Sequence, residues 1–204
     1  MPMKKLCLFL LGIMVCIPAS AQLLKDLDQV SNYNEGLAAI KKDDKWAFIN
    51  DKGTITINFR NDLVATNQNE YELNAPIFKN GRALISRSEE KITYFGYIDE
   101  KGEEVIKSDF VNATPFKNGF AIVMHYTKEV VGQNKLLGKD VVSYEIAEYV
   151  IDINGKALTP MLNARNFVPE KFKSGKSPGF TAKFIGERMI AVHTEENKWE
   201  VYSF

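Results

Sequence analysis

The sequence Ala75-Pro76-Ile77-Phe78-Lys79-Asn80-Gly81-Arg82-Ala83-Leu84-Ile85 recurs in the chain as Ala113-Thr114-Pro115-Phe116-Lys117-Asn118-Gly119-Phe120-Ala121-Ile122-Val123. The second copy keeps Ala, Phe, Lys, Asn, Gly and Ala in place, and its last two positions change only between aliphatic residues. A phrase that recurs in this way indicates an internal repeat built from one supersecondary element. The stretch from Ala75 to Phe116 therefore decides the fold, but its residues do not indicate a substrate.

Three units can be aligned on this phrase, and each contains short apolar runs separated by polar residues. The runs are 37–40, 45–50 and 54–59 in the first unit, 81–86, 94–99 and 105–110 in the second, and 119–123 and 148–155 in the third. Short runs rich in Ile, Val, Phe and Tyr predict three-stranded antiparallel meanders. The spacing of the units is irregular because insertions fall between the predicted strands.

One turn has the same form in all three units. It reads Asn50-Asp51-Lys52-Gly53, Asp99-Glu100-Lys101-Gly102 and Asp152-Ile153-Asn154-Gly155. Asp or Asn at the first position accepts hydrogen bonds from the backbone of its own turn, and Gly at the fourth accepts the left-handed conformation. The pattern predicts a type I turn followed by a glycine bulge that leads into the next strand.

Aromatic side chains two residues apart lie on the same face of a strand. Trp46 and Phe48 form one such pair, and Phe95 and Tyr97 form another. Rings of this size are expected to supply much of the core. A small residue stands between the members of each pair and predicts close packing of neighbouring backbones.

These runs carry a resemblance to a known family. Residues 45–50 read Lys-Trp-Ala-Phe-Ile-Asn and residues 94–99 read Tyr-Phe-Gly-Tyr-Ile-Asp, and both resemble the Lys-Trp-Gly-Tyr-Ile-Asp core of bacterial WG repeats. The resemblance covers most of residues 34–160 and, more loosely, 184–204. Ala47 replaces the family's glycine in one unit, and Phe95 replaces its tryptophan in the other. The resemblance implies a β-rich scaffold that mediates binding, with no catalytic residues to transfer.

The predicted fold is all-β, with repeated antiparallel three-stranded meanders or hairpins stacked as an open repeat array. A partly closed propeller is the alternative, and the irregular spacing favours the open form. We expect a single domain over residues 34–204. Its units are about 34–74, 75–112 and 113–160, with a degenerate unit at 184–204.

The N-terminal residues have two predicted roles. Lys4 and Lys5 precede an apolar run and a small-residue cleavage pattern, so residues 1–21 are predicted to be a signal peptide that exports the protein to the periplasm or the exterior. The run is too short to cross a bilayer, and no later run is long enough, so no transmembrane segment is expected. Residues 22–33 are predicted to be a short helix that caps the array, because Leu23, Leu27 and Val30 share helical spacing.

Composition narrows the possible functions. Cys7 and Cys16 are the only cysteines and lie in the predicted signal peptide, so disulfides and thiolate chemistry are excluded from the mature chain. Removing residues 1–21 takes away two lysines and no acidic residue, which leaves 24 basic and 26 acidic side chains and a net charge of about −2. A chain of this charge gives no electrostatic reason to bind nucleic acid or an anionic membrane.

Residues 175–179, Gly-Lys-Ser-Pro-Gly, match the spelling of a nucleophile elbow. Pro178 has no N–H to offer to an oxyanion hole, and the surrounding residues predict a polar loop instead of a strand and a helix. Ser177 is therefore expected to lie on a surface loop.

Other chemistry-bearing residues also have structural interpretations. His125 and His193 follow apolar runs and have no second histidine at ligand spacing. The acidic pairs border predicted turns and are interpreted as solvated charge; they are Asp43-Asp44, Glu89-Glu90, Glu103-Glu104 and Glu195-Glu196. We predict no catalytic residue, no metal site and no cofactor, and we expect that the chain is not an enzyme.

Two further patterns are weak. The basic residues Lys171, Lys173, Lys176 and Lys183 have few interleaved aromatic residues, which argues against single-stranded nucleic acid as a ligand. Asn112-Ala113-Thr114 matches a glycosylation acceptor in spelling, but it lies inside the repeated phrase.

The repeat pattern breaks at the insertion from Tyr126 to Glu145. It is either a decorated loop or an extension of the hairpin as an arm, whose exposed edges could pair with another chain. We expect an exported binding or scaffolding module that contacts a protein or an envelope component through strand edges. The alternatives are a cell-envelope hydrolase using surface carboxylates and a structural component of an envelope assembly.

Overall fold

The structure is a computed structural model that describes residues 23–67, 74–89, 92–167 and 177–204. The predicted signal peptide lies outside these residues. Strands, turns and irregular segments make up the described part of the chain, and none of its residues is helical. The strands are β1 (Gln29–Val30), β2 (Leu37–Lys42), β3 (Lys45–Asn50), β4 (Ile55–Arg60), β5 (Thr66–Asn67), β6 (Asn74–Ala75), β7 (Ala83–Glu89), β8 (Ile92–Ile98), β9 (Glu104–Phe110), β10 (Asn112–Ala113), β11 (Phe120–Asn134), β12 (Lys139–Asp152), β13 (Leu162–Asn166), β14 (Ala182–Gly186), β15 (Met189–His193) and β16 (Trp199–Ser203).

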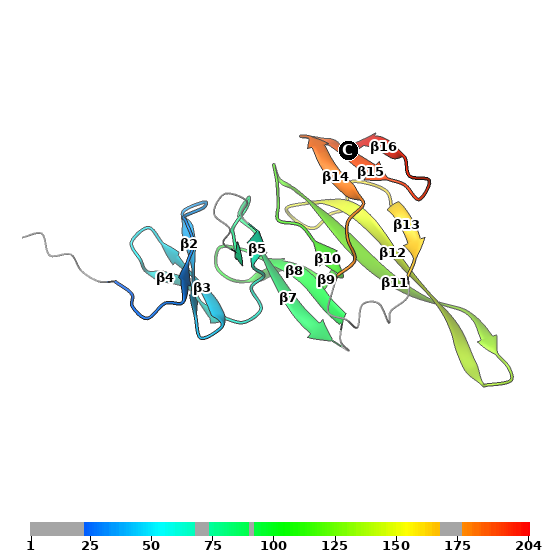
Figure 1. Cartoon of the computed structure of the whole chain (residues 1–204), viewed down its shortest axis with the longest axis horizontal. Coiled ribbons are helices and arrows are strands. Elements are labelled where there is room, and N and C mark those ends of the chain that lie inside the picture. The colour runs from blue at the N-terminus through cyan, green and yellow to red at the C-terminus, as the bar shows by residue number, and fades with distance from the viewer. Residues whose placement is uncertain (1–22, 68–73, 90–91, 168–176) are drawn as a thin grey trace, which may run out of the picture.

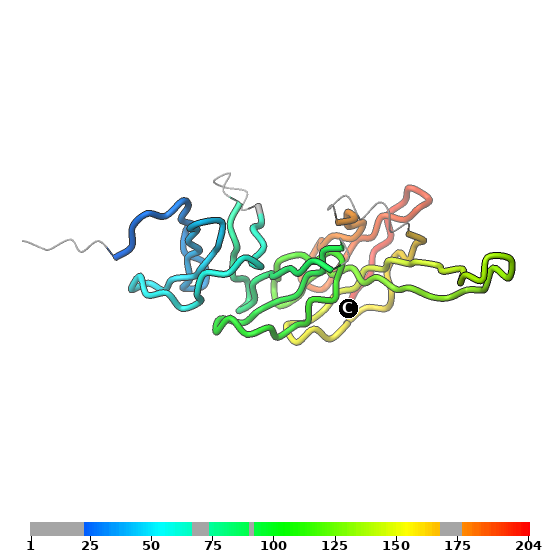
Figure 2. Tube along the Cα trace, turned by 90° about the horizontal axis from the view of Figure 1, so that it is seen from below, coloured from blue at the N-terminus to red at the C-terminus, as the bar shows by residue number. Residues whose placement is uncertain are grey.

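Four antiparallel sheets follow one another along an elongated molecule (Figure 1). The first sheet is β1-β2-β3-β4, the second is β7-β8-β9, the third is β10-β11-β12-β13 and the fourth is β14-β15-β16. A short β5-β6 hairpin lies between the first two sheets in the chain. The sheets do not close into a ring, so the predicted open repeat array is confirmed (Figures 1 and 2).

The sheets can stack on both sides because successive residues of a strand, as in β2 and β7, point to opposite faces of the sheet. Ala38 packs with Ile40 on the N-terminal side of the first sheet, whereas Ala39 joins the cluster shared with the second sheet. In the second sheet Ala83 faces back to the first sheet, and Leu84 faces forward to the third. Each internal sheet thus buries both faces along part of its strands, which explains consecutive buried apolar residues such as Ala83, Leu84 and Ile85 in β7.

The repeated phrase supplies the aromatic contact between units. Phe78 meets Phe48 of the preceding sheet edge to face, with ring centroids 4.7 Å apart, and Phe116 meets Tyr97 in the same way at 4.8 Å. The Tyr97 hydroxyl donates to the carbonyl of Thr114 at 2.7 Å, and burial raises the pKa of this hydroxyl above its ordinary value of 10.0. The predicted contribution of the paired rings to the core is confirmed.

The predicted turn geometry is also confirmed. Asp99 accepts hydrogen bonds from the backbone N–H groups of Lys101 and Glu103 at 2.9 and 3.0 Å, and Gly102 follows with φ of +84°. Asn50 and Asp152 make the equivalent pairs of bonds. The turn between β15 and β16 in the fourth sheet has the same form with other residues. The N–H of Asn197 donates to the carbonyl of Thr194 at 3.0 Å, and Asn197 has φ of +61°.

The prediction of a helix over residues 22–33 is wrong. Its described part, residues 23–33, is irregular apart from β1, and Ser31 bonds Ala39 of β2 through both its N–H and its Oγ. Thr114 bonds Ile122 in the same way in the third unit, so pairing with the adjacent strand overrides the helical spacing of the leucines. Leu24 and Leu27 nevertheless pack against the outer face of the first sheet.

Candidate functional site

Three two-residue hairpin turns lie next to one another and bond across the unit boundaries. Their central residues are Glu35-Gly36, Asn80-Gly81 and Asn118-Gly119, all with positive φ. The Glu35 carboxylate accepts from the N–H groups of Asn80 and Gly81 at 2.7 and 2.9 Å, and the Asn80 side chain accepts from the N–H of Gly119 at 2.8 Å. Each turn therefore fixes the position of the next.

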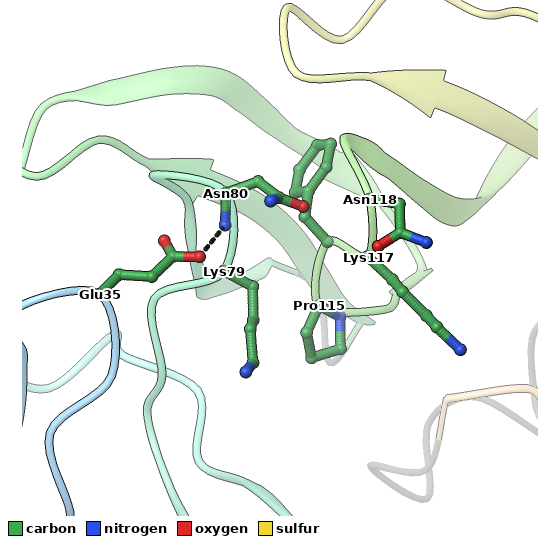
Figure 3. A pocket seen from close by; sticks show the side chains of 7 residues that line it. Glu35, Lys79, Asn80, Pro115, Lys117 and Asn118 are labelled. Carbon is green, nitrogen blue, oxygen red and sulfur yellow. Dashed lines mark hydrogen bonds between the residues drawn. The ribbon is translucent and has the colours of Figure 1, made fainter. Parts of the chain in front are cut away.

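A groove of about 540 Å³ lies along these turns and is lined by Glu35, Lys79, Asn80, Pro115, Phe116, Lys117 and Asn118 (Figure 3). Figure 3 shows the bond from Asn80 to Glu35 at one end and the Lys117 side chain at the other. The backbone donors of Asn80, Gly81 and Gly119 are already engaged by Glu35 and Asn80. The groove is therefore best explained as the seam between repeat units.

Glu148 on β12 is the only buried carboxylate among the described residues. It contacts Arg165 Nη1 at 3.1 Å and accepts hydrogen bonds from the N–H and hydroxyl of Thr181 and from the N–H of Ala182. Thr181 and Ala182 lie at the start of β14, so this one side chain attaches the fourth sheet to the third. No local sequence signal marks Glu148, because its partners lie up to 34 residues away in the chain.

The nucleophile-elbow spelling at residues 175–179 has no matching structure where it is described. Ser177 to Gly179 form an irregular segment that continues to a strand, β14, whereas the motif needs a helix after its serine. The Pro178 carbonyl accepts from the Asn112 side-chain amide at 2.7 Å. The same bond occupies the Asn112 side-chain nitrogen, which is the atom that a glycosylation acceptor would offer. Lys171, Lys173, Lys176 and Gly175 lie outside the described residues.

The histidines and the predicted turn carboxylates do not converge. His125 lies near Phe110, with ring centroids 6.5 Å apart, and His193 lies 4.9 Å from Trp199. The described acidic residues of the four pairs lie at separate hairpin ends: one pair is in the first sheet, one is in the fourth, and Glu89 and Glu103-Glu104 are at opposite ends of β8 in the second. Glu90 lies outside the described residues. Within the described ranges, no group of three or more His, Cys, Asp or Glu side chains could hold a metal ion.

The insertion from Tyr126 to Glu145 is an arm. β11 and β12 continue beyond the third sheet as a two-stranded ribbon, which projects away from the other sheets in both views (Figures 1 and 2). At its base, Tyr126 stacks on Tyr144 with centroids 5.7 Å apart, and Phe167 meets Tyr126 edge to face. β10 and β13 pair only with the inner parts of these strands, so the outer ribbon has two open edges in the described structure.

The tip of the arm is an ordered turn that exposes apolar side chains. The Asn134 side chain accepts from the N–H groups of Leu136 and Leu137, both at 3.1 Å. Leu136 is 97% exposed and Leu137 is 67% exposed. Val130, Val131 and Val141 add exposed apolar surface along the ribbon. The arm thus combines open strand edges with an apolar tip. Neither the edges nor the tip packs against the rest of the described chain, so neither contributes to its stability.

The fold and these surfaces define an all-β repeat protein whose described residues form an open stack of sheets. The family model of the WG containing repeat matches residues 26–46 and 95–126. These two matched segments support a WG-repeat protein, and the resemblance found in the sequence is confirmed. The first matched segment begins at residue 26, inside the predicted cap. Comparisons with curated proteins and with solved structures found no match. No helix in the described part of the chain is long and apolar enough to cross a membrane.

Proposed function

We propose that the chain is an exported, non-catalytic binding module that uses its arm to engage a protein of the cell envelope. The observation that carries the proposal is the ordered arm tip, with Leu136 almost fully exposed at the end of a ribbon with open edges. A two-stranded ribbon is marginal in water without a partner. An extended partner segment could add a strand to either edge while its side chains contact the valines and leucines.

The hydrolase alternative has less support than the binding module. A hydrolase using two carboxylates needs them on either side of one cleft. Glu148 is the single buried carboxylate in the described ranges, and Arg165, Thr181 and Ala182 already engage it. The binding proposal requires no such convergence.

The test compares partner binding by the full chain with partner binding by a variant whose arm is shortened. The carbonyls of Ile122 and Met124 face β10, so the odd-numbered residues of β11 bond to β12, and Glu129 directly opposes Ser143. Replacing residues 130–142 by Asn-Gly should close a two-residue hairpin at this pair, as in the chain's own Asn-Gly turns. We expect the full chain, but not the shortened one, to capture a defined partner from the native envelope fraction.

Two controls make this result specific. Thermal unfolding of the shortened chain should match that of the full chain within about 4 °C, since all of the removed residues except the half-buried Val142 are exposed. A photo-crosslinking residue in place of Leu136 should label the same partner, whereas one in place of Lys52, in an exposed turn of the first sheet, should not. Equal capture by both chains, or equal labelling from both positions, would count against the arm as the binding surface.

A further inference from the structure

The outer face of the fourth sheet carries the residues that are buried between units elsewhere in the array. Ile190 points inward to the third sheet, so its neighbours on β15, including Ala191, point outward. Ala191 pairs with Val201 and His193 pairs with Trp199, which places Val201 and Trp199 on the same outer face. Ile185 of β14 and Met189 of β15 alternate to that face as well.

This face corresponds to the face of the first sheet that packs against the second unit. Trp199 and Val201 occupy the positions of Trp46 and Phe48 in the first unit, because each tryptophan lies at the start of the third strand of its sheet. The register agrees, since Val201 pairs with Ala191 as Phe48 pairs with Ala39. Trp46 is 7% exposed and Phe48 is 1% exposed, since the second unit covers them. Trp199 is 52% exposed and Val201 is 60% exposed. The fourth sheet therefore presents a stacking face without the next sheet in the described structure.

The two ends of the described array differ. Leu24 and Leu27 cover the N-terminal face of the first sheet, together with Ala38 and Ile40. A second chain therefore cannot stack its fourth sheet onto this first sheet without displacing the leucines. Two fourth sheets can stack on one another through identical faces, and a two-fold pair of this kind is closed.

The composition of the face suits such a pair. Ile185, Met189, Val201 and Trp199 provide exposed apolar surface of the kind found in the cores of interfaces between identical subunits. Lys183 lies over the Trp199 ring, with Nζ 4.4 Å from its centroid, and His193 lies beside the same ring. These two groups add polar contacts beside the apolar side chains of the face.

We infer that the outer face of the β14-β15-β16 sheet is a dimer interface that takes the same face of a second copy of the chain. The interface extends by one step the sheet-on-sheet stacking that holds the units together. It is separate from the arm, whose exposed residues lie on β11, β12 and the turn between them. The inference therefore does not depend on the proposed function of the arm.

The test measures self-association of the purified chain without the predicted signal peptide. Sedimentation velocity from about 1 to 200 μM should show a reversible monomer–dimer equilibrium. Val201→Glu, which places a charge among the apolar side chains of the face, should raise the dimer dissociation constant at least about tenfold. Val131→Glu is the matched control, because Val131 is equally exposed but lies on the arm, and it should leave the equilibrium unchanged.

Tryptophan fluorescence gives an independent measure. Trp46 is already buried within the chain, beneath the second unit, so its emission should not change on dimerisation. A blue shift on dimerisation should therefore come from Trp199, and it should be absent in Val201→Glu. Far-UV circular dichroism checks that the variant remains folded. A chain that is monomeric throughout the range, an open-ended series of larger oligomers, or equal effects of the two glutamate substitutions would each overturn the inference.

Discussion

Two glycines of the second unit, Gly96 and Gly102, show how single residues control the packing of strands and sheets. At Gly96, a Cβ would lie 2.6 Å from the carbonyl oxygen of Ile106, because β9 bulges over this point of β8. Glycine at this position thus permits close approach of two backbones within a sheet. At Gly102, φ is +84°, and a Cβ would lie 3.4 Å from Ile57 of the preceding unit. This second glycine serves both the turn and the contact between units.

Gly102→Val should lower the free energy of unfolding by about 1 to 3 kcal/mol. A β-branched residue is strained at this φ, and its branches would also press on Ile57 and Arg60, whose Nη1 donates to the Gly102 carbonyl at 2.9 Å. Chemical denaturation of the variant measures the loss. Gly132→Val is the control, because Gly132 lies in β11 without a positive φ and a Cβ there meets nothing within 4 Å. Equal stability of the two variants would contradict the role given to Gly102.

At the scale of strands, the hairpins are fixed by local turns, but the attachment of one sheet to the next needs longer contacts. Arg60 is an example: it pairs with Asp62 at 2.6 Å, which raises the pKa of the guanidinium through this hydrogen bond, and it also reaches Gly102 in the next unit. Glu148 is the corresponding contact between β12 and β14. Both connect a side chain of one unit to backbone groups of its neighbour.

Glu148→Ala should destabilise the attachment of the fourth sheet by about 3 to 5 kcal/mol, because Arg165 would keep a largely buried charge without its partner and the N–H groups of Thr181 and Ala182 would lose their acceptor. Hydrogen exchange should accelerate most in β14 and β15. Glu129→Ala, which removes an exposed carboxylate from β11, is the control and should leave this exchange unchanged. Unchanged protection of β14 in Glu148→Ala would show that the carboxylate does not hold the sheet.

For the whole molecule, each sheet contacts mainly its neighbours, as the separate apolar clusters between successive units show. In such an array stability is approximately the sum of unit and nearest-neighbour terms. A core substitution should therefore act locally along the stack. A closed propeller would instead connect its first and last units.

Phe48→Ala should remove about 3 to 5 kcal/mol by creating a cavity beside Phe78. Hydrogen exchange should accelerate in the first and second sheets while the fourth sheet keeps its protection. Ile190→Ala is the reciprocal variant, because Ile190 is buried between the third and fourth sheets, and it should accelerate exchange there but not in the first sheet. Loss of protection throughout the chain in both variants would indicate a single cooperative unit instead of a stack of nearest neighbours.

The sequence by itself determined the strands, the turns and the repeat. Each of these depends on neighbours within a few residues: Asp99 with the N–H groups of Lys101 and Glu103, and Trp46 with Phe48 on one strand face. The open stacking also followed from the repeat and its irregular spacing. The helix over residues 22–33 was wrongly predicted from equally local spacing, because the pairing of Ser31 with Ala39 is a contact between strands that spacing alone does not reveal.

Only the tertiary structure decided how the units meet and which surfaces stay exposed. The partners of Glu148, the contact of Glu35 with the next turn and the projection of the arm all join or separate residues far apart in the sequence. Trp46 and Trp199 have similar local sequences, yet one is buried and the other is half exposed. The physical reason is that burial depends on whether another sheet covers the face, and this is a property of the assembled stack.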